Sequence, residues 1–79
     1  MTPKLETAEY VESYKIFISF RDGKSGTIDL QGELWGEVFE PLKEISEFKK
    51  FSLNSELNTI TWPNGADLAP EFLYKHVAA

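Results

Sequence analysis

The chain has 79 residues and a formal net charge of -5, and 42% of its residues are hydrophobic and 14% aromatic. This length predicts one small domain over residues 1–79, with enough apolar side chains for a compact core. Because cysteine is absent, disulfide bonds and thiolate chemistry are excluded. No apolar run approaches the roughly 20 residues of a membrane span, and the first residues lack the apolar centre of a signal peptide. We therefore expect a cytoplasmic protein with no membrane partner.

The charge pattern also bears on the kind of partner. Nucleic-acid binding normally needs a basic stripe that displaces counterions from phosphates. Only Lys43, Lys49 and Lys50 come near such a stripe, and Glu44 and Glu47 interrupt it. We expect no direct nucleic-acid binding by this domain alone. An acidic small domain is better suited to a basic protein partner.

Two segments rich in β-branched and aromatic residues, 14–20 and 25–30, predict the strands of a first hairpin. A tight two-residue turn at Asp22-Gly23 would set Ile16 opposite Asp29 and so place an apolar face against a polar one. We therefore predict an odd-length loop, such as 22–24, or a bulge, which keeps the aliphatic side chains on one face. The pairs expected from such a loop are Ile18 with Ile28 and Ile16 with Leu30. The preceding segment, 5–13, alternates imperfectly and predicts an edge strand.

Apolar residues recur at three- and four-residue spacing between Leu34 and Phe48, which is typical of an amphipathic helix. Pro41 removes a backbone donor and Gly36 weakens the first turn, so we predict two short helical pieces, 34–40 and 41–50. Acidic residues lie roughly opposite the apolar stripe. They are either an acidic recognition surface or, as we prefer, an ordinary solvated face.

A second hairpin is predicted from strands at 51–54 and 59–62. Leu53 would pair with Ile60 and Phe51 with Trp62, so that all four side chains face one way. The connecting loop would then be the four residues 55–58.

The stretch TWPNGADLAP predicts a strand end, a turn and a helix start in succession. Trp62 is extended because it precedes a proline, and Pro63-Asn64-Gly65 forms a tight turn in which Gly65 accepts a positive φ. Pro70 suits the first position of a closing helix over 70–77. We expect the Asp67 carboxylate to accept a bond in the bend before this helix. Scaffolding therefore explains the stretch better than a binding site does.

Three motifs carry a resemblance to a known family. They are F-x-DG-x-x-G-x-I-DL, then EVFEPLKE, then TWPNGADLAP-x-x-LY. Together they resemble the small bacterial domain of unknown function 2442, from about Tyr14 to Tyr74. The resemblance implies two hairpins with short helices between and after them. It also implies an association with small two-gene modules of the toxin–antitoxin type, and some relatives carry a helix-turn-helix after this module, which we do not expect here.

The residues that match the family motifs are treated as structural positions. They are Asp22, Gly23, Asp29, Leu30, Phe39, Leu42, Trp62, Pro63, Asn64, Gly65, Asp67, Pro70, Leu73 and Tyr74.

The sequence favours no catalytic, cofactor or metal site. His76 is the one histidine, so a Ser-His-Asp arrangement or a paired-histidine metal site has nothing else to draw on. Gly23 and Gly26 flank a hairpin turn and not a phosphate-binding loop. Asp22, Asp29 and Asp67 would act as acid and base only if they met in one cleft. We therefore predict that the protein is not an enzyme.

These observations together predict an α+β domain with one antiparallel sheet of two hairpins and short helices packed on one face. The predicted core is Ile16, Ile18, Ile28, Leu30, Val38, Phe39, Leu42, Phe48, Leu53, Ile60 and Leu73. The predicted function is a protein-interaction module, antitoxin-like, whose partner is another small protein. The alternative is a sensory or oligomerisation module related to transcriptional regulators but lacking the DNA-binding domain, which would self-associate or bind a small ligand.

Overall fold

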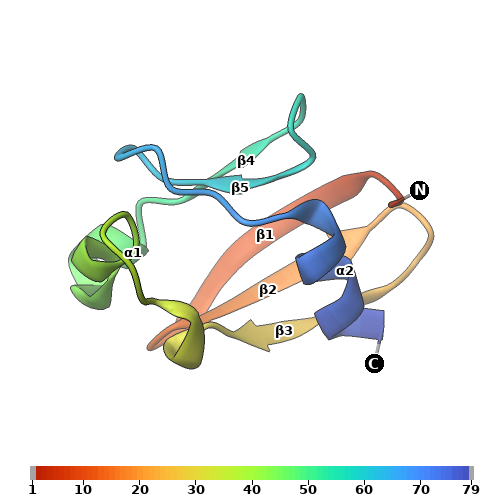
Figure 1. Ribbon diagram of the computed structural model, residues 1–79. Coiled ribbons are helices and arrows are strands. Elements are labelled where there is room, and N and C mark those ends of the chain that lie inside the picture. The colour runs from red at the N-terminus through yellow and green to blue at the C-terminus, as the bar shows by residue number, and fades with distance from the viewer. Residues whose placement is uncertain (1, 79) are drawn as a thin grey trace.

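The computed structural model describes residues 2–78 and shows two antiparallel sheets with short helices around them (Figure 1). The first sheet has the order β1-β2-β3 and the second is the hairpin β4-β5. The strands are β1 (Leu5–Glu12), β2 (Lys15–Phe20), β3 (Ser25–Asp29), β4 (Ser52–Asn54) and β5 (Thr59–Thr61). The helices are the 3-10 turns η1 (Gln31–Glu33) and η2 (Glu40–Lys43), the single turn α1 (Ile45–Phe48), and α2 (Pro70–Ala78).

The α+β class and the two hairpins are confirmed, but the prediction of one four-stranded sheet is wrong. The N-terminal segment explains the difference, because β1 is long enough to pair with β2 along most of its length. Strands β4 and β5 have only three residues each and pair with one another. They lie above β1 in Figure 1, and β1 contacts β4. The predicted edge strand is therefore the element through which the first sheet meets the second.

The first hairpin has the odd-length loop that the side-chain pattern predicted. The loop is Arg21-Asp22-Gly23, one position earlier than expected, so Ile16 pairs with Ile28 and Ile18 with Gly26. The predicted pairing register was wrong by two residues, but the predicted buried face of the hairpin is correct, because a shift of two residues keeps each side chain on the same face. Ile16, Ile18 and Ile28 are all buried on it.

The segment 34–40 is not the helix that its apolar spacing predicted. Gly36 adopts a φ of 95°, a left-handed conformation that interrupts a right-handed helix and suits glycine. Leu34 is buried in the core, whereas the neighbouring Trp35 is 71% exposed. Val38, which we predicted to be in the core, is 46% exposed. The second piece is also shorter than 41–50, since η2 and α1 are separate turns joined at Glu44.

The second hairpin follows the prediction closely. Leu53 pairs with Ile60, and residues 55–58 form the connecting loop. Phe51 and Trp62 lie just outside the paired residues, and their ring centroids are 6.3 Å apart. Side-chain alternation therefore predicted this register correctly.

One hydrophobic core joins all of these elements. Phe39 and Leu53, predicted as core residues, are only partly buried and pack against it. The core was also predicted without Leu5, Phe20, Leu34, Trp62 and Ala66. The buried apolar residues are Leu5, Ile16, Ile18, Phe20, Ile28, Leu30, Leu34, Leu42, Phe48, Ile60, Trp62, Ala66 and Leu73.

Candidate functional site

The WPNG stretch is a three-residue hairpin loop. The Gly65 N–H donates to the Trp62 carbonyl and the Trp62 N–H donates to the Ala66 carbonyl, each at 2.9 Å. Gly65 has a φ of 92°, as predicted. The Asn64 side chain forms one hydrogen bond within the loop and another to a distant segment. Its Oδ1 accepts the Ala66 N–H at 3.0 Å, and its Nδ2 donates to the Val38 carbonyl at 2.9 Å.

Trp62 is a structural residue at the base of this loop. Its side chain is 3% exposed, and its indole Nε1–H donates to the Phe48 carbonyl at 2.8 Å. Rings of Phe39, Phe48 and Phe51 surround it, with centroids 5.9–6.3 Å away. The Phe39 and Phe51 rings pack edge-to-face against Trp62, which adds to the stabilisation from burial alone. The WPNG turn therefore closes over an aromatic cluster.

Asp22 occupies in the first hairpin loop the place that Asn64 occupies in the WPNG loop. Its Oδ1 accepts the Lys24 N–H at 3.0 Å, and its Oδ2 accepts the Tyr74 hydroxyl at 2.5 Å. The bond from Tyr74, together with that from the Lys24 N–H, lowers the pKa of the exposed Asp22 carboxyl. The same bond raises the pKa of the Tyr74 hydroxyl. The pair joins the first hairpin to α2.

The remaining motif residues also have structural places. Leu30, Leu42 and Leu73 are buried in the core. The Asp29 Oδ1 accepts the Gln31 N–H at 3.0 Å at the end of β3. Pro70 is the first residue of α2, as predicted.

Asp67 departs from its predicted role. Its backbone forms an isolated bridge with Thr61, but no hydrogen bond reaches its carboxylate from any residue in the range 2–78. The expected bond in the bend before α2 is therefore wrong. Asp67 instead lines a cavity of about 310 Å³ between residues 33–39 and the start of α2. The other lining residues are Glu33, Trp35, Phe39, Leu68, Ala69 and Phe72.

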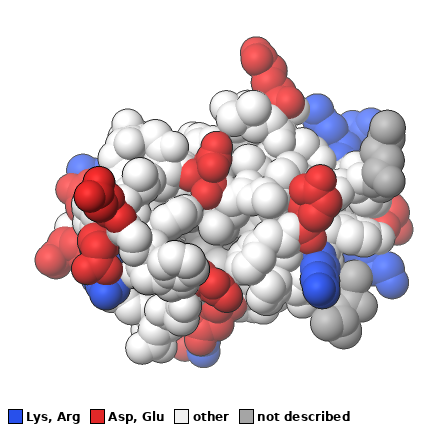
Figure 2. All heavy atoms as spheres, in the orientation of Figure 1, with Lys and Arg blue, Asp and Glu red and all other residues white. Residues whose placement is uncertain are grey.

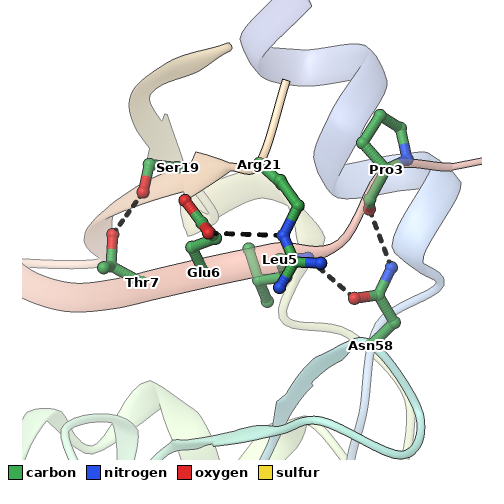
Figure 3. A network of polar contacts seen from close by, with 7 residues as sticks. All are labelled: Pro3, Leu5, Glu6, Thr7, Ser19, Arg21 and Asn58. Atoms are coloured by element: carbon green, nitrogen blue, oxygen red, sulfur yellow. Dashed lines mark hydrogen bonds and ion pairs between the residues drawn. The ribbon is translucent and has the colours of Figure 1, made fainter. Parts of the chain in front are cut away.

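A larger and more open groove, of about 560 Å³, lies between the N-terminal segment and the two hairpin loops. Hydrogen bonds cross beside it, as Figure 3 shows. Asn58 Oδ1 accepts the Leu5 N–H at 2.7 Å, and Asn58 Nδ2 donates to the Pro3 carbonyl at 2.9 Å. Arg21 of the first hairpin loop pairs with Glu6 of β1 at 3.5 Å. The hydrogen bonds beside this groove therefore connect the N-terminal end of β1 to the loop of the second hairpin.

The aspartates that would be needed for acid–base chemistry lie apart. Asp22 lines the open groove, Asp67 lines the smaller cavity, and Asp29 holds the turn after β3. His76 Nδ1 lies 2.8 Å from the Phe72 carbonyl on α2. Within residues 2–78 no three His, Asp or Glu side chains are grouped so that they could hold a metal ion. The part of the chain that the structure describes also contains no helix long and apolar enough to cross a membrane.

With this geometry in view, comparison with known proteins assigns the family. The model of the family described as "Protein of unknown function (DUF2442)" matches residues 5–79. The chain belongs to this family. No curated protein and no solved structure matches it. The DUF2442 match covers every element from β1 to α2, so both sheets and the smaller cavity lie inside the family domain.

The sequence did not predict the smaller cavity of this DUF2442 domain. It indicated no functional role for Glu33 and Trp35, and it indicated a structural role for Phe39 and Asp67. The available signal was a tryptophan beside a glycine in a weak helix pattern, at Trp35-Gly36. That pattern fits a helix start as well as an exposed loop, so only the structure distinguishes them.

Proposed function

We propose that this domain is a protein-interaction module that binds a small basic protein, in the way an antitoxin binds and restrains its partner. The observation that carries the proposal is the exposure of Trp35 at 71% beside Val38 at 46% in an acidic chain. Tryptophan is enriched among the residues that dominate binding energy at protein interfaces. A large exposed indole in a small domain therefore supports a contact surface.

The segment that presents Trp35 is held in place from both ends. Leu34 is buried in the core, and the Val38 carbonyl accepts the bond from Asn64 of the WPNG loop. A contact residue on a fixed backbone loses little freedom on binding, which favours affinity. The WPNG turn thus contributes to the proposed surface indirectly, by fixing the backbone that presents Trp35.

The charge distribution supports a basic partner. Figure 2 shows acidic side chains across one face of the molecule, while lysine and arginine lie mainly toward its periphery. Charge complementarity of this kind raises association rates and discriminates against acidic partners.

The test is affinity capture of the tagged protein from lysate of its own cells, followed by mass spectrometry. The wild type is compared with Trp35→Ala and with Leu57→Ala, a matched control because Leu57 is 53% exposed in the distant β4–β5 loop. We expect the wild type and Leu57→Ala to retain the same basic protein. We expect Trp35→Ala to capture at least tenfold less of this basic protein, while the circular dichroism spectrum of the variant stays unchanged.

Two outcomes contradict the proposal. One is capture of the same protein equally by the wild type and Trp35→Ala. The other is no captured protein together with a concentration-dependent increase in mass by light scattering, which would favour the oligomerisation module instead.

A further inference from the structure

We infer that the cavity between Glu33 and Phe72 binds the guanidinium group of an arginine side chain on the basic partner. This inference rests on the proposed function for the source of the arginine. The walls of the cavity are aromatic, and its charged lining residues are acidic. For this reason it is named here the aromatic-acidic pocket, with Glu33, Trp35, Phe39, Asp67 and Phe72 as its side walls.

The carboxylates of the pocket are available to a cation. Glu33 and Asp67 take part in none of the ion pairs formed within residues 2–78, and no hydrogen bond from those residues reaches either carboxylate. The pocket lining contains no lysine or arginine. Glu6, Glu12, Glu40 and Glu47, by contrast, are each paired with a basic side chain. The pocket is therefore a site of uncompensated negative charge.

Aromatic faces supply the second half of the argument. The aromatic residues Trp35, Phe39 and Phe72 line the same cavity as Glu33 and Asp67. A cation over an aromatic face is attracted by the ring quadrupole, most strongly over tryptophan. Leu68 and Ala69 add apolar lining, which suits the methylene stem of a long basic side chain.

Arginine fits these features better than lysine does. Its planar guanidinium stacks on aromatic rings, is more weakly hydrated than an ammonium group, and presents several donors that can reach two carboxylates at once. The cavity volume, about 310 Å³, is at the lower end of the range for ligand pockets. That size suits one inserted side chain and not a folded segment of the partner.

The test uses the ¹⁵N-labelled full chain and three capped peptides, Gly-Arg-Gly, Gly-Lys-Gly and Gly-citrulline-Gly. The two indole N–H signals report separately, because Trp35 lines the pocket and Trp62 is buried elsewhere. We expect the arginine peptide to shift the Trp35 indole signal and the backbone amides of 67–72 in a saturable way. We expect the lysine peptide to bind several-fold more weakly and the neutral citrulline peptide to cause no shift.

Variants assign the contacts. Asp67→Asn and Glu33→Gln should each weaken binding of the arginine peptide at least threefold. Glu56→Gln, which removes an acidic charge beside the other groove, should leave it unchanged. Trp35→Phe should retain part of the binding and Trp35→Leu should lose it, because leucine is apolar without a π face. An unshifted Trp62 signal in each variant shows that the fold is retained.

The inference is overturned if citrulline binds as well as arginine, if lysine binds equally, or if Glu56→Gln weakens binding as much as Asp67→Asn. It is also overturned if the captured partner is retained equally by Asp67→Asn, and the proposed interaction function would survive that result. If the peptide binds as expected but capture returns no basic protein, the proposed function fails and the pocket assignment stands.

Discussion

Two pairs of residues, Asp22-Gly23 and Asn64-Gly65, form equivalent turns in separate hairpins. In each, the side-chain oxygen of the first residue accepts the N–H two residues on, and the glycine has a positive φ. In each, the remaining side-chain atom reaches a distant segment, to Tyr74 in one case and to the Val38 carbonyl in the other. A short polar residue followed by glycine thus forms a turn and also fastens it to another part of the molecule.

The strain at Gly65 gives a prediction at the scale of the residue. Gly65→Ala should lower the free energy of unfolding by about 1–2 kcal/mol, because an L-residue is disfavoured at a φ of 92°. No atom lies within 4 Å of an added Cβ, so backbone conformation alone causes the loss. Gly32→Ala is the control, since its Cβ also meets open space and its φ is ordinary. Urea unfolding should show no loss for Gly32→Ala. Equal losses in both variants would contradict the argument.

The Asp22–Tyr74 bond makes a second residue-scale prediction, in the pH dependence of stability. The folded pKa of Asp22 is lowered, so its contribution is present above about pH 4 and is lost as the pH falls through the folded value. The folded pKa of Tyr74 is raised, so its contribution is present below about pH 10 and is lost as the pH rises through the folded value.

Nuclear magnetic resonance titration of the carboxyl carbons measures the effect of the Tyr74 hydrogen bond on the pKa of Asp22. Tyr74→Phe should move the pKa of Asp22 upward, toward its ordinary value. An unchanged Asp22 titration in Tyr74→Phe would show that the hydroxyl does not hold the carboxylate.

Among the elements, the start of β1 is joined to the β4–β5 hairpin by hydrogen bonds that the side chains of Lys4 and Asn58 form. Asn58, with a φ of 58°, supplies the bonds to Leu5 and Pro3. Asn58→Gly tolerates the backbone conformation but loses both bonds, at a cost of about 1–3 kcal/mol. Hydrogen exchange of the Leu5 amide should accelerate. Asn54→Ala is the control, because Asn54 Oδ1 accepts the Leu57 N–H within the same hairpin. Unchanged Leu5 exchange in Asn58→Gly would refute the link.

The elements also show what the sequence could and could not predict. Strand alternation predicted the buried face of the first hairpin and the register of the second, because residues i and i+2 must share a face. Helical spacing failed over 34–40, since it placed Trp35 on an apolar helix face and Val38 in the core, and could not show that Gly36 takes a left-handed conformation. The turns were predictable because their chemistry is local. The aromatic-acidic pocket was not, because its two walls are about thirty residues apart in sequence and meet only by tertiary packing.

At the scale of the whole molecule, the two sheets share one core. Leu5 of β1, Ile28 of β3 and Ile60 of β5 belong to the same buried cluster. The protein should therefore unfold in one cooperative transition. In a Trp35→Phe variant, fluorescence reports Trp62 beside the second hairpin, and far-ultraviolet circular dichroism reports both sheets. The two unfolding curves should share one midpoint, and an earlier fluorescence transition would mean that β4–β5 melts independently.

The long-range hydrogen bonds between the two ends of the chain also affect the order in which the protein folds during its synthesis. Lys4 and Leu5 bond to residues 51 and 53 positions later, and Asp22 bonds to a residue 52 positions later. A ribosome adds residues from the N-terminus, so β1 to β3 emerge well before the side chains that secure them. Closing such long loops slows folding relative to a helical protein of similar size. During synthesis the apolar face of the first sheet therefore stays uncovered until the second hairpin and α2, which supply Ile60 and Leu73 to the core, have been made.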